Sequence, residues 1–188
     1  HAAGFLVTPT LLKGGTITLL PGFDPDRIID LIEDGINTLF LVPTMIYALL
    51  DHPRIQDADL SNLELLVYAS APMSPPRLRD ALHLFGPVMM QCYGQTENIH
   101  LTVMRKSEHD ILKQERFLSC GRAPAGMQTE ILNEDNLPVP VGEIAEVCAR
   151  GPSVMSGYWK QPEATQQTLD NGWLRTGDLG RKDEEGFI

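Results

Sequence analysis

The chain has 188 residues, of which 43% are hydrophobic and 21% charged, and its formal net charge is −10 at pH 7. The length fits one large domain or two small ones, and the apolar content is enough to bury a core, which excludes an intrinsically disordered chain. The acidic balance excludes the basic surface that nucleic acids and anionic membranes attract, so we expect no nucleic-acid partner.

Short apolar runs alternate with helical patterns over the first hundred residues. Strands are predicted at residues 16–20, 38–42, 63–69 and 88–93. Helices are predicted to begin at Pro25 (after Asp24 as the N-cap), at Pro43 and after Ser74, and to end at Gly35, near His52 and at Gly86. This alternation predicts a parallel sheet with right-handed crossovers, in which ligands bind beyond the carboxyl ends of the strands. The segments 69–74 and 94–97 are therefore the first candidates for a site.

The pattern of predicted secondary structure changes after the charged stretch 105–116. Short strands are predicted at 127–132 and 144–150, separated by turn residues, and helical periodicity returns only at 162–169. We therefore predict an α/β fold class in three parts. These are a partial parallel α/β subdomain over 1–104, a connector over 105–118, and a β-rich subdomain over 119–188, built as a small antiparallel sheet or part of a distorted barrel.

Cysteine usage and hydropathy bear on location. Cys92, Cys120 and Cys148 form no CxxC pair and have no histidine at metal-ligand spacing, which favours free thiols in a reducing cytoplasm. The longest uncharged stretch, residues 36–50, is too short to span a bilayer and contains Pro43, so we expect no transmembrane segment.

Several common catalytic motifs are missing from the sequence. It contains no GxxxxGK[ST], GxGxxG, HExxH or EF-hand pattern, and Met155 stands where a nucleophile elbow at Ser153 needs glycine. The usual hydrolase, dehydrogenase and metalloprotease interpretations therefore lose their support.

The run YGQTE, at the end of a predicted parallel strand, combines four useful groups. Tyr93 offers an aromatic face, Gly94 permits close backbone approach, Thr96 carries a hydroxyl and Glu97 a carboxylate. These groups can stack a flat base, contact a phosphate and ligate Mg²⁺, which is often held by one protein carboxylate together with substrate phosphates. The alternative is an ordinary turn between a strand and a loop.

Two further segments could carry function. Asp178 is predicted just past a short strand, where its carboxylate can accept hydrogen bonds from two vicinal hydroxyls; the alternative is a turn aspartate that caps its own backbone. The loop 151–159 could border a site, but we expect Tyr158 and Trp159 to pack into the core.

The motifs YGQTE, CGRAPAG, VGEIAEVCARGPSVMSGYW, NGWLRTGDLG and DEEGFI, in this order, resemble the adenylate-forming superfamily, and HAAGF and YASAPMS also fit its pattern. That superfamily includes acyl-CoA synthetases, aryl-CoA ligases, luciferases and peptide-synthetase adenylation domains. The resemblance covers nearly the whole chain. It implies a ligase in which a carboxylic acid, here expected to be a fatty acid, attacks the α-phosphate of Mg-ATP, and coenzyme A then displaces AMP from the acyl-adenylate.

The resemblance implies a role for each matching residue. Tyr93 would stack on adenine, with Gly94 close to the nucleotide. Thr96 would contact phosphate, Glu97 would ligate Mg²⁺, and Asp178 would bind the ribose hydroxyls.

Other positions match the rest of the family's site. Three would line the adenine and acyl pocket: Ser70, Ala71 and Pro72. Ser70 stands where many members have glycine. His1 matches a histidine near the acyl carboxylate and the thiol tunnel. Ala3, Gly4 and Cys92 would lie along the acyl pocket, which Cys92, often glycine in the family, would narrow.

The family's phosphate loop would lie upstream of His1, and its hinge and catalytic lysine would follow DEEGFI. We therefore expect an internal fragment that presents half of a nucleotide site, does not turn over alone, and exposes hydrophobic surface or self-associates. Two alternatives stay open: a peptide-synthetase-type adenylation domain, which usually has proline where Gln95 stands, and a non-catalytic nucleotide- or partner-binding domain. The acyl chain length is not fixed, because hydrophobic pockets discriminate by only about 1–3 kcal/mol per methylene.

Overall fold

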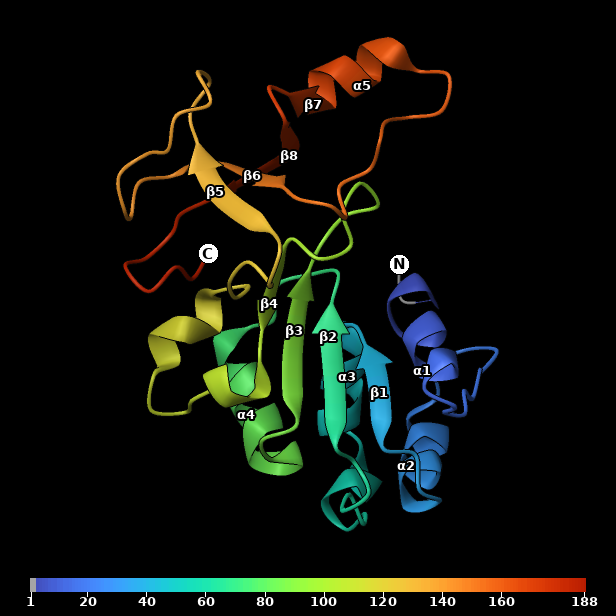
Figure 1. Ribbon diagram of the computed structural model, residues 1–188. Helices are drawn as coiled ribbons and strands as arrows, with labels where there is room; N and C mark the ends of the chain where they lie inside the picture. The colour runs from blue at the N-terminus through green and yellow to red at the C-terminus, as the bar shows by residue number, and fades with distance from the viewer. Residues whose placement is uncertain (1–2) are drawn as a thin grey trace. The chain divides into compact units, whose positions relative to one another are not determined.

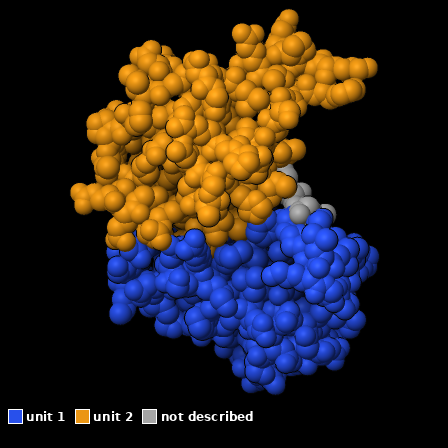
Figure 2. Space-filling model, viewed as in Figure 1, with its two compact units in different colours: residues 1–91, 105–118 blue, residues 92–104, 119–188 orange. Residues whose placement is uncertain are grey.

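The computed structural model describes residues 3–188, and Figure 1 shows its helices and strands. Two compact units share the chain: residues 1–91 together with 105–118, and residues 92–104 together with 119–188 (Figure 2). The backbone therefore passes from one unit to the other three times. The domain limits expected from the sequence stay a prediction.

The first unit alternates helices and strands, as the sequence predicts. Its elements are η1 (Ala3–Val7), α1 (Thr8–Leu12), α2 (Pro25–Glu33), β1 (Thr38–Leu41), α3 (Pro43–Leu50), η2 (Pro53–Gln56), β2 (Leu65–Ala69), α4 (Pro75–Phe85), most of β3 (Met89–Tyr93), η3 (Lys106–Glu108) and η4 (Gln114–Leu118). With β4 (Thr102–Met104), the strands form a sheet in the order β1-β2-β3-β4. β1 and β2 pair in parallel from Thr38 opposite Leu65 to Leu41 opposite Tyr68, and β1, β2 and β3 point the same way in Figure 1. The predicted α/β class with a parallel sheet is confirmed.

Local signals fix the helix limits. The side chain of Asp24 accepts a hydrogen bond from the Asp26 amide at 3.0 Å, which caps α2. Proline occupies the first position of α2, α3 and α4, where no amide hydrogen is needed. Gly86, with φ of 73°, ends α4. Ser74 precedes α4 as predicted, although its side chain makes no capping bond.

The core of the first unit lies where the helices meet the sheet. Its fully buried members include Ile29 of α2, Ile46 of α3, Leu66 of β2 and Leu78 of α4, and Phe117 of η4 joins them from the later segment. A Leu or Ile in such a position stabilises the fold by roughly 1.5–3 kcal/mol relative to an exposed one.

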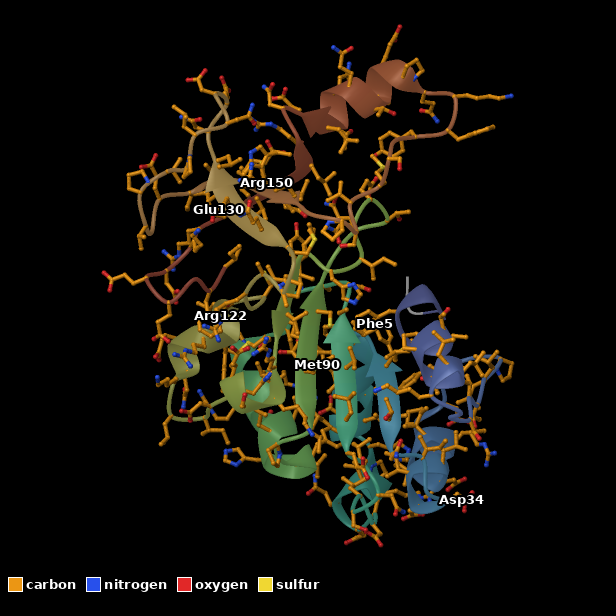
Figure 3. All side chains as sticks on the ribbon, in the orientation of Figure 1. Phe5, Asp34, Met90, Arg122, Glu130 and Arg150 are labelled. Carbon is orange, nitrogen blue, oxygen red and sulfur yellow. The ribbon has the colours of Figure 1, made fainter. Side chains whose placement is uncertain are left out.

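The predicted strand over residues 16–20 is wrong. These residues have no regular structure, and Leu19 is 82% exposed. β1 is an edge strand of the sheet in the described residues, and residues 16–20 do not pair with it. The helical turns at residues 3–12 replace it as the N-terminal element (Figure 3 labels Phe5), and the ring of Phe5 contacts that of Phe40 at a centroid distance of 6.4 Å.

The second unit is built on an antiparallel sheet in the order β5-β6-β8-β7. Its elements are β5 (Gln128–Leu132), β6 (Ala145–Arg150), α5 (Pro162–Thr168), β7 (Leu169–Asp170) and β8 (Trp173–Gly180). The predicted antiparallel sheet is confirmed, and among the described residues it does not close into a barrel. No helix within residues 3–188 combines the length and the apolar character that crossing a membrane requires.

Candidate functional site

The loop after β3 folds back on its own strand. The Leu101 amide donates to the Tyr93 carbonyl at 2.9 Å, and the Gln95 amide donates to the Asn98 carbonyl at 2.8 Å. A Cβ atom on Gly94 would lie 2.0 Å from the Ile99 carbonyl oxygen. Glycine is therefore required here by the turn itself, whether or not a nucleotide also passes close to it.

Tyr93, Gln95 and Asp178 form a hydrogen-bonded cluster within the second unit. The Tyr93 hydroxyl donates to Asp178 Oδ2 at 2.5 Å, and Gln95 Nε2 donates to the same oxygen at 3.1 Å and to the Thr176 carbonyl at 2.8 Å. Burial, and then this bond to Asp178, raise the pKa of Tyr93, so the phenol stays a donor. The structure thus brings together two predicted site residues that are 85 positions apart.

Only part of the Tyr93 ring is available to a ligand. The side chain is half-buried and packs against a small core cluster of Leu101, Ala149 and Leu174. Asp178 is exposed. A half-covered aromatic ring beside an exposed carboxylate suits a ligand that joins a flat base to a diol.

Asp178 lies inside a strand, whereas the sequence placed it past one. β8 continues to Gly180, but its pairing with β6 is interrupted by a bulge at residues 176–178, which includes Asp178. Gly177 has φ of 76° at that point. The carboxylate accepts from Tyr93 and Gln95 and does not cap its own turn, so the turn-aspartate alternative is wrong.

Glu97 is held by a tyrosine of the loop 151–159. The Tyr158 hydroxyl donates to Glu97 Oε1 at 2.5 Å, and the Met155 amide donates to the Glu97 carbonyl at 2.8 Å. The bond to Glu97 raises the pKa of Tyr158. The expectation that Tyr158 and Trp159 pack into the core is wrong, since Tyr158 is half-buried and Trp159 is 84% exposed.

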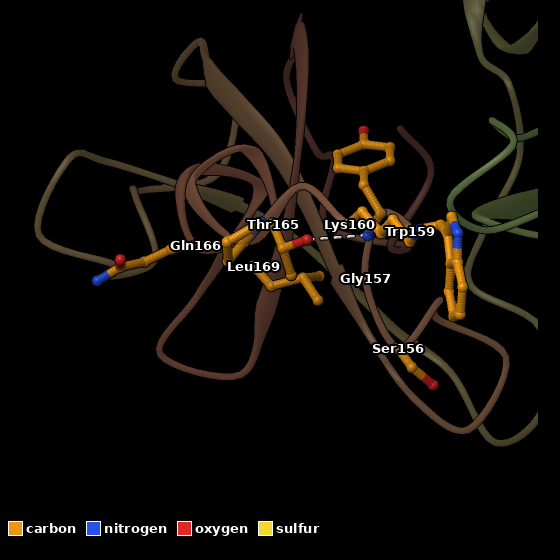
Figure 4. Close-up of a pocket in the computed structure, with 9 residues that line it drawn as sticks. Ser156, Gly157, Trp159, Lys160, Thr165, Gln166 and Leu169 are labelled. Carbon is orange, nitrogen blue, oxygen red and sulfur yellow. Dashed lines mark hydrogen bonds between the residues drawn. The ribbon is translucent and has the colours of Figure 1, made fainter.

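A hollow of about 440 Å³ lies beside this loop (Figure 4). Residues 156–160 line it together with residues of α5, and the Tyr158 amide donates to Thr165 Oγ1 at 2.9 Å. Tyr158 borders the hollow, but Tyr93, Glu97 and Asp178 do not. The hollow is therefore separate from the Asp178 cluster.

The other predicted residues fall in several places. Thr96 is exposed in the loop after β3, and Cys92 is buried within β3. Burial raises the pKa of Cys92 to about 12, so its thiol is protonated and unreactive at neutral pH. Ala3 and Gly4 begin η1, and His1 lies outside the described residues.

Ser70, Ala71 and Pro72 are exposed residues of the first unit that follow β2 directly. The backbone of Ser70 has φ of 73°, in the left-handed region that favours glycine. This conformation gives a physical reason why glycine would suit the position. The segment ends where the Ser74 amide donates to the Tyr47 hydroxyl at 2.8 Å.

A magnesium ion fits Glu97 only in the company of other ligands. Within residues 3–188, no group of three or more histidine, cysteine, aspartate or glutamate side chains could hold a metal ion. Mg²⁺ does not need such a cage, because it is often bound by one or two carboxylates together with substrate phosphates and water. Tyr158 holds one oxygen of Glu97, and a carboxylate has a second oxygen to offer.

Sequence reasoning missed the neighbours that hold the two acidic residues. Gln95 was weighed only as a family marker, and Tyr158 was assigned to the core. The signal for both is their place beside a glycine in a loop, in YGQTE and in SGYW, where a polar side chain can reach across to another loop.

The chain belongs to the AMP-binding enzyme family, whose model matches residues 1–159. It is 42% identical over its whole length to a medium/long-chain-fatty-acid–CoA ligase of Mycobacterium tuberculosis, of which it covers 33%.

Two solved structures are similar in fold as well as in sequence. The amide bond synthetase McbA from Marinactinospora thermotolerans is 38% identical, with a TM-score of 0.92 over 98% of this chain and 38% of that one. ATP-bound MatB from Rhodopseudomonas palustris is 31% identical, with a TM-score of 0.87 over 100% of this chain and 37% of that one. The chain thus spans about a third of the length of these relatives.

Proposed function

We propose that this chain is the part of an AMP-forming acyl-CoA ligase that binds the nucleoside of ATP and of the acyl-adenylate. The parent enzyme would join a carboxylic acid, a fatty acid in our interpretation, to AMP and then transfer the acyl group to coenzyme A. The observation that carries the proposal is the cluster of Tyr93, Gln95 and Asp178, in which an exposed carboxylate is oriented by two donors.

Asp178 is suited to a vicinal diol. An ionised carboxylate has about four lone-pair sites, and Tyr93 and Gln95 occupy two of them on Oδ2. The sites that remain can accept the 2′- and 3′-hydroxyls of a ribose. The Tyr93 ring, held by the same bond, would contact adenine, with Gly94 beside the nucleotide.

Thr96 and Glu97 would serve the phosphate end of the ligand. When Mg²⁺ is bound, it neutralises charge on the phosphates and stabilises the departing pyrophosphate. Glu97, oriented by Tyr158, would supply one oxygen ligand, and the Thr96 hydroxyl would contact phosphate. We place Ser70, Ala71 and Pro72 on the adenine and acyl pocket, Ala3, Gly4 and Cys92 along the acyl pocket, and His1 near the acyl carboxylate. The three free thiols favour a cytoplasmic location.

A second acceptor chemistry has a specific observation in its favour. One solved relative, 38% identical to this chain, is an amide bond synthetase. In our proposal, an acyl-adenylate would serve either reaction, and the two would differ in whether a thiol or an amine displaces AMP. The complete gene product, incubated with a fatty acid, Mg-ATP and either coenzyme A or an amine, would separate them; we expect the thioester, and an amide would favour the second function.

The nucleoside site can be tested on the 188-residue chain. In an NMR titration of ¹⁵N-labelled protein with AMP, we expect shifts at Tyr93 and at residues 176–178, and a loss of affinity of about tenfold or more in Asp178→Ala, the effect of losing charge-assisted hydrogen bonds. Asp135→Ala removes another exposed carboxylate of the second unit and should leave the affinity unchanged. Equal affinity in wild type and Asp178→Ala would contradict the proposal.

A further inference from the structure

The strand that carries Asp178 is irregular at that residue and at the two before it. β6 and β8 pair regularly at Ala145 opposite Gly180 and Glu146 opposite Leu179, and again at Cys148 opposite Arg175. Between these pairs, the three residues 176–178 of β8 face the single residue Val147 of β6. A bulge of this kind leaves backbone groups outside the ladder and changes the direction of the side chains that follow.

Side chains satisfy the amides that the bulge removes from the ladder. Glu146 Oε1 accepts from the Gly177 amide at 2.9 Å. Thr176 Oγ1 accepts from the Asp178 amide at 3.1 Å and donates to the Val147 carbonyl at 2.7 Å. The backbone on the N-terminal side of Asp178 is thus held by Glu146 and Thr176 rather than by strand pairing.

Glu146 is itself fixed by an ion pair. Arg175 Nη1 donates to Glu146 Oε2 at 2.7 Å, and the two side chains are only 16% and 23% exposed. Arg175 Nη2 also donates to Asn136 Oδ1 at 2.7 Å and to the Asn133 carbonyl at 3.0 Å. The hydrogen bond to Glu146 raises the pKa of Arg175, so the guanidinium stays charged. One oxygen of Glu146 therefore faces a fixed cation while the other faces the bulge.

We propose that Glu146 is a positioning residue for nucleoside binding, which holds the bulge at Gly177 so that the carboxylate of Asp178 meets both hydroxyls of a ribose. The inference rests on the proposed function, because it assigns Glu146 a task only if Asp178 binds a diol. Glu146 touches no ligand in this arrangement. Its effect passes through one backbone hydrogen bond to the residue before Asp178.

A purely structural role predicts a different outcome. If Glu146 only stabilised the sheet, its loss would lower the affinity for every adenine nucleotide alike. If it positions Asp178, its loss would lower the affinity for nucleotides with a diol and spare those without one. AMP and 2′,3′-dideoxy-AMP differ only in those two hydroxyls.

The test compares both nucleotides by NMR titration of the 188-residue chain, a method that measures millimolar as well as tighter dissociation constants. Wild type should prefer AMP by about tenfold or more, the discrimination expected from hydrogen bonds between hydroxyls and a carboxylate. In Glu146→Ala, the preference should fall to within about twofold, while the affinity for dideoxy-AMP stays within about twofold of wild type. The Gly177 amide signal should also move.

The control is Glu130→Ala. Glu130 of β5, labelled in Figure 3, pairs with Lys182 in the same unit and is similarly half-buried. Among the described contacts, Glu130 makes no hydrogen bond to the bulge. Glu130→Ala should therefore keep the wild-type preference for AMP over dideoxy-AMP. If Glu146→Ala does not fold, Glu146→Gln supplies the second measurement. Glutamine retains a carbonyl oxygen that can accept from the Gly177 amide. Its preference for AMP over dideoxy-AMP should therefore lie between that of wild type and no preference at all.

The outcomes separate the two proposals. A full preference for AMP in a folded Glu146 variant overturns the positioning role and leaves the proposed function standing. Equal binding of AMP and dideoxy-AMP by wild type overturns the role of Asp178, and the inference with it. An equal loss of affinity for both nucleotides in Glu146→Ala also overturns the positioning role.

Discussion

The hydroxyl of Tyr158 donates to a carboxylate oxygen of Glu97 at 2.5 Å, although the two residues are 61 positions apart. Tyr93 makes the equivalent bond to Asp178 at the same distance. Each of the two acidic residues proposed to meet the nucleotide is therefore oriented by a tyrosine from another segment of the second unit.

The bond between Tyr158 and Glu97 predicts energetic coupling. In a double-mutant cycle of Tyr158→Phe and Glu97→Gln, we expect a coupling free energy of about 0.5–1 kcal/mol, below the usual range for a charged acceptor because Tyr158 is only half-buried. Urea unfolding followed by tryptophan fluorescence measures it, since Trp173 is buried in this unit. Strictly additive single-variant effects would contradict the prediction.

The same pair predicts a dependence on alkaline pH. Because the hydrogen bond to Glu97 raises the pKa of Tyr158, the stability that it contributes is fully present below the ordinary tyrosine value of about 10. That stability is lost as the pH rises through the pKa that Tyr158 has in the folded chain. Ultraviolet titration should show Tyr158 ionising at lower pH in Glu97→Gln than in wild type. An unchanged titration would mean that the bond is not formed in solution.

Gly94 should tolerate no side chain. In Gly94→Ala the new Cβ would meet the Ile99 carbonyl at 2.0 Å, a backbone atom that cannot rotate away. We expect the unfolding free energy to fall by about 1–3 kcal/mol, the usual effect of overpacking. Gly22→Ala is the matched control, because its Cβ would meet nothing within 4 Å and should change stability little. Equal stability of the two variants in urea unfolding would disprove the steric reason.

Ser70→Gly should stabilise the first unit. Ser70 has φ of 73°, which costs a residue with a side chain about 1–2 kcal/mol, whereas glycine adopts it freely and loses about 0.5–1 kcal/mol through its more flexible unfolded chain. A net gain of up to about 1 kcal/mol is expected from thermal unfolding. Ser61→Gly, at an exposed turn that lacks a positive φ, should give no gain. A loss of stability in Ser70→Gly would show that the serine side chain itself is needed.

His109 should make the first unit sensitive to acid. Its Nδ1 lies 2.8 Å from the Arg105 carbonyl and therefore carries a proton, and its Nε2 lies 3.0 Å from the buried Tyr68 hydroxyl. Burial lowers the pKa of His109 against the opposing effects of the hydrogen bond to the Arg105 carbonyl and of the Glu108 charge, so the folded chain takes up a proton less readily than the unfolded chain. The stability that neutral His109 contributes is present above a pH of about 6.5, the ordinary histidine pKa. It is lost as the pH falls from there through the pKa of His109 in the folded chain.

Urea unfolding by far-ultraviolet circular dichroism at several pH values from neutral into the acid range would measure this loss. We expect a shallower acid dependence in His109→Gln than in wild type. The exposed His83 provides the control, since His83→Gln should keep the wild-type slope. The same slope in His109→Gln as in wild type would assign the acid sensitivity to other groups.

The sequence predicts the elements whose signals are local. Asp24 with Pro25 marks the start of α2, and Pro43 and Gly86 mark the limits of other helices, because caps and proline act within one turn. The prediction of a strand at residues 16–20 fails because an apolar run becomes a strand only when it pairs with a neighbour. No local pattern reports whether that pairing forms.

The sequence predicts the acidic residues of the candidate site, but it does not predict the side chains that hold them in place. The resemblance to the adenylate-forming family singled out Glu97 and Asp178, but Tyr158 and Glu146 act through contacts with residues distant in sequence. The bulge in β8 had one signal, the glycine in RTGD, which an uninterrupted strand disfavours. That signal also fits a turn, and the sequence could not decide between the two.

The return of residues 105–118 to the first unit has a consequence for synthesis on the ribosome. Phe117 fills the core built by residues 1–91, and His109 reaches Tyr68 of β2. A nascent chain that has emerged only as far as β3 therefore lacks part of the interior of its first half, and it must carry a segment of the second half before that interior closes. No single proteolytic cut separates the two units from each other, because each is built from two stretches of the chain.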